Sequence, residues 1–282
     1  EAAGVVIEVG EGVTAFKEGD HVVSSFISMC GKCRQCVRGR PVLCENARKA
    51  MFTLPDGTVR TKGADGEDLN VFGACGVMAE YATMHVDNCV KVDESVPMQN
   101  AALVGCAVMT GVGAVFNTDN VEPGSRTAVF GIGGVGLNAI QGCVTAGAEM
   151  IVAVDNNEKK LEMAREFGAT HTVNISEVED GAKAVKKLTG GVDYAFECVG
   201  AGAVVEQAYK CLGRGGTAVV VGVSDPKDRT SITTLTLPAD EKTLKGSWLG
   251  SARPQYDFPR ILGLYKAGKL KLDELVTRTY HI

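Results

Sequence analysis

The sequence predicts an α/β protein with two parts, a doubly wound parallel sheet and, before it, a smaller antiparallel unit resembling a barrel. From about Cys106 onward, apolar strands such as "RTAVFG" and "MIVAVD" alternate with helical segments, which is typical of βαβ units on a sheet covered on both faces. Before Cys106, short β-prone runs are separated by glycines and turns, which is typical of antiparallel strands.

The first part is expected to contain four strands, at "AGVVIEV", "DHVVSSF", "AEYATMHV" and "CVKV". A cysteine-rich loop interrupts them. The polar stretch from Pro55 to Asn70 follows this loop and is expected to be exposed. Residues 1–107 are therefore interpreted as one domain.

The second part, residues 108–250, begins after a helical segment near Ala107 to Phe116. Its expected strands are "RTAVFG", "MIVAVD", "HTVNI", "DYAFECVG" and "TAVVVGV", with helices between them. The β-prone run "TSITTLTL" is interpreted as an edge strand. Residues 251–282 contain one helix, near Phe258 to Ala267, and one expected strand, so this tail is expected to pack back on the first domain.

Composition excludes several classes of function. The net charge is −5 and no basic run exceeds two residues, which disfavours nucleic-acid and anionic-membrane partners. No apolar stretch reaches the roughly 18 residues of a membrane span. The ten cysteines are dilute in 282 residues, which favours reduced thiols and a cytoplasmic location. Because Glu1 is not an initiator methionine and both ends are abrupt, the chain is expected to be cut from a longer one.

Four cysteines lie close together in "CGKCRQCVRGRPVLC", with the spacing C-x2-C-x2-C-x7-C: Cys30, Cys33, Cys36 and Cys44. Short spacings of this kind let a loop wrap one tetrahedral zinc ion, and four protein ligands leave no open position, so the zinc would be structural. An iron–sulfur cluster is disfavoured because the final gap is too long for the ferredoxin pattern. Disulfides remain an alternative under oxidation, although closely spaced cysteines pair poorly.

A glycine-rich loop, "GIGGVG", lies between an apolar strand and a helix, with glycines at Gly131, Gly133, Gly134 and Gly136. The next strand ends in Asp155, 19 residues after Gly136, where a dinucleotide-binding (Rossmann) domain places an acid on the ribose 2′-hydroxyl. A carboxylate there repels a 2′-phosphate, so NAD is favoured over NADP. The alternative is a tight strand-to-helix turn with an exposed aspartate.

These two motifs in this order resemble the zinc-dependent medium-chain alcohol dehydrogenases. "EAAGVVIEVGEGVTAFKEGDHV" resembles the stretch after the histidine of the family's G-H-E signature, "GCAVMTGVGAV" its last catalytic-zinc segment, and "VDNNEKK" part of its NAD site. The long cysteine lobe is most similar to the animal-type and glutathione-dependent formaldehyde dehydrogenase branches. The resemblance implies a GroES-like catalytic domain, incomplete at both ends, beside the Rossmann domain.

The resemblance also implies the site residues. Cys106 matches the last of three ligands (Cys, His, Cys) of a catalytic zinc with an open fourth position, and Glu1 matches an acid near that zinc. Thr110 matches a residue beside the nicotinamide, and Lys160 a cation that joins Asp155 at the adenosine ribose. Three valines match positions that line the cofactor cleft: Val199, Val221 and Val223.

The sequence departs from the family at the first catalytic cysteine, the hydroxyl residue of the proton relay and the ligand histidine, for which it has no match. Its four histidines do not match the missing ligand: His21, His85, His171 and His281. Segments that would complete the catalytic domain after Ile282 are also missing.

The resulting hypothesis is an NAD-linked zinc oxidoreductase that interconverts small alcohols with aldehydes or ketones. Two alternatives stay open: a glutathione- or mycothiol-dependent formaldehyde dehydrogenase, and a non-catalytic truncated NAD-binding protein. A homodimer or homotetramer is expected, because an apolar edge strand invites pairing with a partner.

We predict that these 282 residues by themselves bind NAD and the four-cysteine zinc but oxidise no alcohol, because only Cys106 matches a catalytic-zinc ligand. The measurement is NADH formation with a panel of primary and aryl alcohols. Zinc-dependent turnover that Cys106→Ser abolishes would show that another residue of the chain serves as a ligand.

Overall fold

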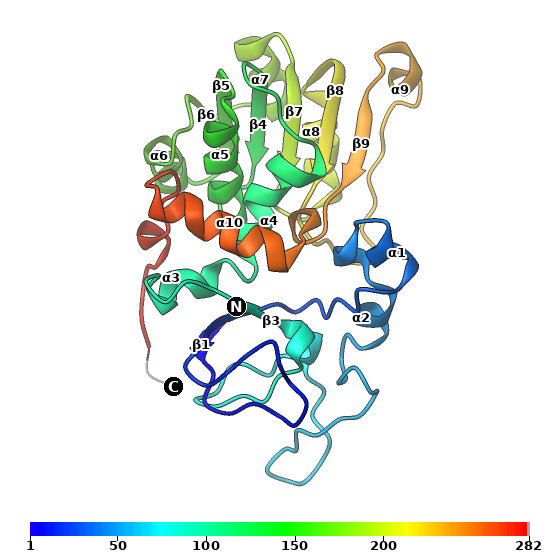
Figure 1. Ribbon diagram of the computed structural model, residues 1–282. Helices are drawn as coiled ribbons and strands as arrows, with labels where there is room; N and C mark the ends of the chain where they lie inside the picture. The colour runs from blue at the N-terminus through cyan, green and yellow to red at the C-terminus, as the bar shows by residue number, and fades with distance from the viewer. Residues whose placement is uncertain (281–282) are drawn as a thin grey trace. The chain divides into compact units, whose positions relative to one another are not determined.

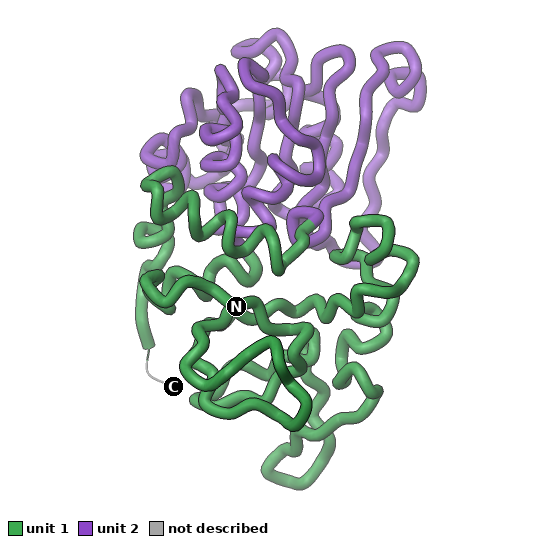
Figure 2. Tube along the Cα trace, in the orientation of Figure 1, with its two compact units in different colours: residues 1–106, 252–282 green, residues 107–251 purple. Residues whose placement is uncertain are grey.

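The computed structural model describes residues 1–280, so His281 and Ile282 lie outside the described residues. The chain divides into two compact units (Figure 2). Unit 1 comprises Glu1–Cys106 and Ala252–Ile282, and unit 2 comprises Ala107–Ser251. Within residues 1–280, no helix is both long enough and apolar enough to cross a membrane.

Unit 2 is built on a six-stranded parallel sheet with the strand order β6-β5-β4-β7-β8-β9 (Figure 1). This confirms the doubly wound α/β fold. The strands are β4 (Arg126–Phe130), β5 (Met150–Asp155), β6 (His171–Asn174), β7 (Val192–Glu197), β8 (Leu212–Val220) and β9 (Thr243–Gly246). The helices are α4 (Ala107–Gly113), the π-helix η4 (Ala114–Thr118), α5 (Gly134–Ala146), α6 (Glu158–Glu166), α7 (Gly181–Thr189), α8 (Gly202–Lys210) and α9 (Thr236–Ala239), with the 3₁₀ turn η5 (Leu249–Ser251).

The centre of the sheet is buried on both faces, which explains why β4 and β5 are buried at nearly every position. Phe130 of β4 belongs to one buried cluster with Val185 of α7 and Ala208 of α8. Val129 points to the opposite face, because a Cβ built on Gly136 of α5 would lie 3.5 Å from Val129 Cγ1. Helices α7 and α8 therefore cover one face, and α5 covers the other.

The prediction that "TSITTLTL" forms an edge strand is wrong. Residues 230–235 form no strand, and α9 begins at Thr236, whose Oγ1 donates a hydrogen bond to Thr233 O at 2.7 Å. The position beside β8 is taken by β9, from the pair Thr217↔Thr243 to the pair Val220↔Gly246. A β-prone composition does not by itself make a strand, because strand formation depends on the packing that the context provides.

Unit 1 contains a three-stranded antiparallel sheet, β1-β2-β3. Its strands are β1 (Ala3–Val5), β2 (His21–Ser24) and β3 (Cys89–Lys91). Its helices are α1 (Arg34–Val37), α2 (Glu45–Lys49), α3 (Met98–Leu103) and α10 (Pro254–Lys266), with 3₁₀ turns η1 (Pro41–Leu43), η2 (Phe72–Ala74), η3 (Val86–Asn88) and η6 (Asp273–Leu275). The antiparallel pairing agrees with the sequence, although the described residues supply three strands and do not close a barrel.

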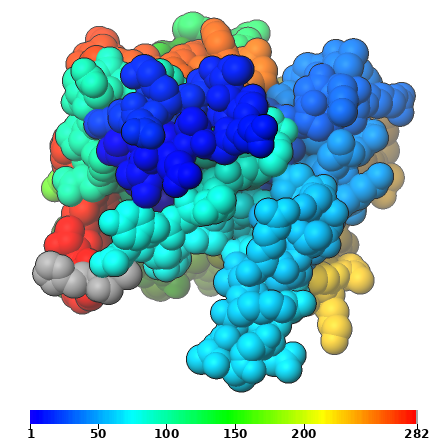
Figure 3. All heavy atoms as spheres, turned by 60° about the horizontal axis from the view of Figure 1, so that its bottom comes forward, coloured from blue at the N-terminus to red at the C-terminus, as the bar shows by residue number. Residues whose placement is uncertain are grey.

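Two strands expected in unit 1 are not formed. Residues 79–85 of "AEYATMHV" form no strand, because the chain there turns into η3, where His85 Nδ1 accepts a hydrogen bond from Asp87 N. The tail after α10 forms η6 in place of a strand. The polar stretch 55–70 is exposed as expected, and it projects from the unit in Figure 3 (light blue).

The core of unit 1 beside the sheet depends on Asn88, which is completely buried. Its Nδ2 donates hydrogen bonds to Ser25 O at 2.7 Å and to Gly73 O at 2.9 Å. Ser28 Oγ donates to its Oδ1. A buried amide whose donors and acceptor are all used ties three segments together that are distant in sequence.

Candidate functional site

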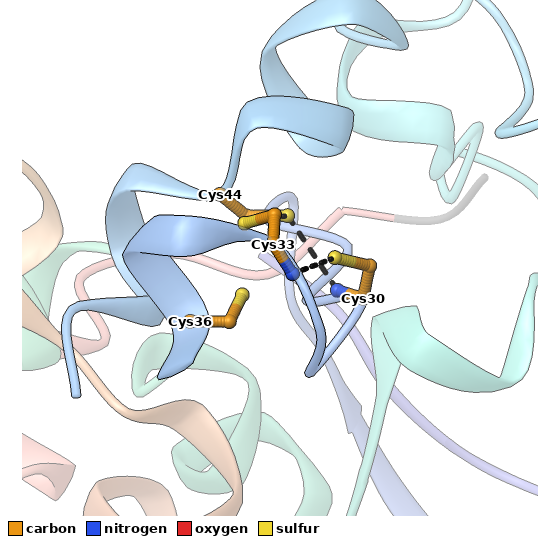
Figure 4. A group of neighbouring side chains, drawn as sticks. All are labelled: Cys30, Cys33, Cys36 and Cys44. Atoms are coloured by element: carbon orange, nitrogen blue, oxygen red, sulfur yellow. Dashed lines mark hydrogen bonds between the residues drawn. The ribbon is translucent and has the colours of Figure 1, made fainter. Parts of the chain in front are cut away.

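The four cysteines of the lobe are brought together by α1, η1 and α2. Their sulfur atoms lie within 4.8 Å of one another and face a common centre (Figure 4). The sulfurs of Cys33 and Cys44 are 4.0 Å apart, about twice the S–S bond length of a disulfide, and all four thiols are free. None of these four cysteines forms a disulfide in this structure.

Backbone N–H groups of the lobe lower the pKa of two of the thiols, Cys30 and Cys33, and so favour their thiolate forms. The N–H of Cys33 points to Cys30 Sγ at 3.4 Å, and the N–H of Cys30 to Cys44 Sγ at 3.5 Å. Backbone N–H groups of Cys36 and Glu45 lower the pKa of the Cys33 thiol to about 6. Burial raises the pKa of Cys36 to about 12, and a bound divalent cation would reverse that effect by deprotonating a coordinating thiol.

This donor set fits zinc. Zn–S bonds of about 2.3 Å in a tetrahedron put neighbouring sulfurs about 3.8 Å apart, close to the spacing of Cys33 and Cys44. Cys30, Cys33, Cys36 and Cys44 would occupy all four positions, leaving none for a substrate. Within residues 1–280, this is the one group of three or more ligand side chains close enough to share a metal.

The glycine loop connects β4 to α5. Gly131 has φ +88°, and a Cβ there would lie 2.5 Å from Val199 Cγ2. A Cβ at Gly136 would lie 2.0 Å from Gly131 O, so the helix can approach the strand this closely only without a side chain. A Cβ at Gly133, just before the helix, would meet no atom within 4 Å, and a Cβ at Gly134 would lie in ordinary contact with Ala107 Cβ at 3.7 Å.

The first turn of α5 is free to receive an anion. It has no side-chain cap and no acidic residue of its own. Its terminal N–H groups and the positive end of the helix dipole are therefore not neutralised by a side chain of that turn. This is the arrangement that binds a pyrophosphate at a helix N-terminus.

Asp155 ends β5 beside the glycine loop and is mostly buried, with 7% of its surface exposed. Its Oδ2 accepts a hydrogen bond from Ile132 N at 2.8 Å, and its Oδ1 accepts one from Asn157 N at 3.0 Å. Lys160 Nζ lies 3.7 Å from Oδ2. Asp155 is therefore a loop-fixing carboxylate in this structure, a role that the spacing of the motif did not reveal.

The three valines lie at the carboxyl ends of strands. Val199 follows β7 and is 53% exposed, and Val223 lies beyond the end of β8 and is 76% exposed, so both can contact a ligand. Val221 is 7% exposed and contributes mainly packing. Glu197, at the end of β7, was not singled out from the sequence, although a charged residue that ends an apolar strand was a visible signal.

The residues expected at the catalytic zinc are divided between the units. Cys106 is the last residue before the break in unit 1, and Thr110 lies on α4 in unit 2. Within unit 1, a Cβ at Gly105 would lie 3.6 Å from Glu1 Cα, so Glu1 lies near the backbone just before Cys106. Cys106 belongs to no cluster of three metal-ligating side chains among the described residues.

Comparison with known proteins identifies two family models. Residues 1–94 match the alcohol dehydrogenase GroES-like domain, and residues 134–267 match the zinc-binding dehydrogenase family. The chain is 44% identical to the putative alcohol dehydrogenase D of Mycobacterium tuberculosis, over 100% of this chain and 77% of that protein.

Two further proteins extend the comparison. The S-(hydroxymethyl)glutathione dehydrogenase of Paracoccus denitrificans is 37% identical, over 99% of this chain and 77% of that protein. The crystal structure of benzyl alcohol dehydrogenase from Acinetobacter calcoaceticus superposes with a TM-score of 0.87 at 33% identity, over 97% of this chain and 74% of that one.

We predict that Cys33→Ser abolishes tight zinc binding and lowers the melting temperature by roughly 5–10 °C, because a structural zinc contributes directly to folding. Metal analysis and thermal unfolding measure the two effects. Cys89→Ser is the matched control, since Cys89 lies on β3 outside the cluster and should keep one zinc per chain. A stoichiometric iron–sulfur chromophore in the parent protein would contradict the zinc assignment.

Proposed function

The chain belongs to the zinc-dependent medium-chain alcohol dehydrogenase family, and from this premise we propose that it interconverts an alcohol with its aldehyde or ketone, using NAD. The observation that carries the proposal is the carboxyl edge of the parallel sheet, where the glycine loop, the N-terminus of α5 and Asp155 come together. Ligands of open α/β sheets bind at this edge, where the strand order reverses.

Each part of this edge has a distinct task. The N–H groups at the start of α5 hold the pyrophosphate, while the missing side chain at Gly133 lets the backbone approach it. Asp155 already accepts two backbone hydrogen bonds, and each carboxylate oxygen keeps a lone pair for a ribose hydroxyl. Lys160 balances part of that charge. When bound, NAD supplies the hydride acceptor.

The catalytic zinc is proposed for the active protein with Cys106 as one ligand, Glu1 nearby and Thr110 beside the nicotinamide. A zinc ion bound there would supply Lewis-acid chemistry for the substrate oxygen. The described residues supply one of the expected ligands, so the roles of these three residues rest on the resemblance.

The substrate is proposed to be a small alcohol or aldehyde. The similarity to both a benzyl alcohol dehydrogenase and an S-(hydroxymethyl)glutathione dehydrogenase makes an aryl alcohol and a glutathione adduct the two classes to assay first.

Asp155 should determine the cofactor preference. We expect Asp155→Asn to weaken NADH binding about tenfold and to reduce the discrimination against NADPH, because a charge-assisted hydrogen bond and a repulsive charge are both lost. Fluorescence titration with NADH and NADPH measures both effects. Asp180→Asn is the control. Asp180 caps α7 through a hydrogen bond from Lys183 N at 3.0 Å, and asparagine also accepts that bond, so this variant should keep both its stability and its NADH affinity. Unchanged affinity in Asp155→Asn would show that Asp155 serves the loop only.

Self-association is proposed to use β9, because this strand pairs with β8 on one side and is the last strand of its sheet. An unpaired edge offers N–H and C=O groups to a second copy. We expect sedimentation velocity at micromolar protein to show a dimer or tetramer, and Lys245→Pro on β9 to reduce it. A monomer in the parent chain would overturn this proposal.

A further inference from the structure

Glu197, the last residue of β7, has an unusual position for a carboxylate. It is completely buried, whereas most acidic side chains of this chain reach solvent. Burying a charged group is unfavourable unless hydrogen bonds or opposite charges compensate it. The contacts of Glu197 show what this side chain is doing at the carboxyl edge of the sheet.

Glu197 joins two loops through four hydrogen bonds. Its Oε1 accepts from Val199 N at 2.8 Å and from Gly200 N at 2.7 Å. Its backbone oxygen accepts from Val221 N and from Gly222 N, both at 2.9 Å. One residue therefore fixes the turn that follows β7 and the segment that follows β8.

The loops after β7 and β8 pack backbone to backbone at Gly200 and Gly222, and the Val199 side chain packs against Gly131 of the glycine loop. The Cβ position of Gly131 is 2.5 Å from Val199 Cγ2, and the Cβ position of Gly222 is 2.1 Å from Gly200 N. Because neither glycine position has room for even a Cβ atom, these close-packed segments are expected to shift together. A change in the turn at Val199 would therefore be transmitted to the pyrophosphate-binding loop.

Stability alone does not account for this carboxylate. Its second oxygen, Oε2, is buried and has no hydrogen-bond partner within residues 1–280. A buried acceptor without a partner is destabilising, so half of this group works against folding. A buried acceptor of this kind in a folded protein calls for an explanation, and a role in a functional site is one.

We propose that Glu197 is a positioning residue of the NAD site. Its carboxylate fixes the backbone at Val199 and Gly200 and so holds Val199 against Gly131, so that the cofactor meets a preformed cleft. This inference rests on the proposed function, because it requires that the glycine loop bind NAD. Glu197 itself does not contact the cofactor.

The experiment is NADH titration by fluorescence on the 282-residue chain, with thermal unfolding of every variant. Glu197→Gln keeps an Oε1 acceptor and should bind NADH within about twofold of the parent chain. Glu197→Leu removes the acceptor and should bind about tenfold more weakly. Glu197→Asp keeps the charge but is one methylene shorter, so it should also weaken binding, and it serves if the leucine variant does not fold.

Asp119→Asn is the matched control in unit 2. Asp119 also has a mostly buried carboxylate with one unpartnered oxygen, and it pairs with Lys245 of β9 and not with a residue of the glycine loop. This variant should lose stability and keep its NADH affinity. Three results would overturn the proposal: parental affinity in both Glu197→Leu and Glu197→Asp, failure of Glu197→Gln to restore binding, or an equal loss in Asp119→Asn. If the parent chain binds no NADH, that result contradicts the proposed NAD site itself, and the proposed role of Glu197 is then also wrong.

Discussion

The pairing of β4 with a parallel strand on each side is the constraint on which the rest of unit 2 depends. β4 pairs with β5 along one edge and with β7 along the other, so the chain must leave its carboxyl end between two occupied positions. The pairing continues past the strand ends, since Gly131 N donates to Val154 O at 2.9 Å and Cys198 N donates to Phe130 O at 2.8 Å. The glycine loop is consequently held closely between these strands, and positions 131 and 136 have no room for a side chain.

Two acidic residues flank this space and have related roles. Asp155 ends β5 and binds the glycine loop through Ile132 N, while Glu197 ends β7 and binds the turn that presses on Gly131. In each case the chain has left the sheet, so its backbone N–H groups have no partner strand, and a carboxylate at a strand end accepts their hydrogen bonds instead. The two carboxylates differ in how far solvent can reach them. Asp155 retains some exposure, which suits it to a ligand, whereas Glu197 is fully enclosed, which suits it to holding other groups.

The cysteine lobe follows a different principle, because almost no regular sheet or long helix supports it. Its two helices, α1 and α2, have four and five residues. Helices this short are marginal by themselves, so the lobe depends on contacts made through its sulfur atoms. This explains why closely spaced cysteines were informative in the sequence, since a local loop brings its own ligands together and needs no distant segment.

The sequence by itself determined the features that depend on local pattern: the alternation of apolar strands and helices from β4 to β8, the cysteine cluster, and the glycines that precede α5. It was unreliable where a strand needs a partner. "AEYATMHV" and "TSITTLTL" have the composition of strands, yet η3 begins at Val86 within the first and α9 at Thr236 within the second. Only the tertiary structure decided these segments, because strand formation depends on pairing and packing with neighbouring segments and not on composition alone. The same reason applies to Glu197: its partners lie two, three and about 25 residues away, and no spacing rule connects an acid at one strand end to the N–H groups of the next loop.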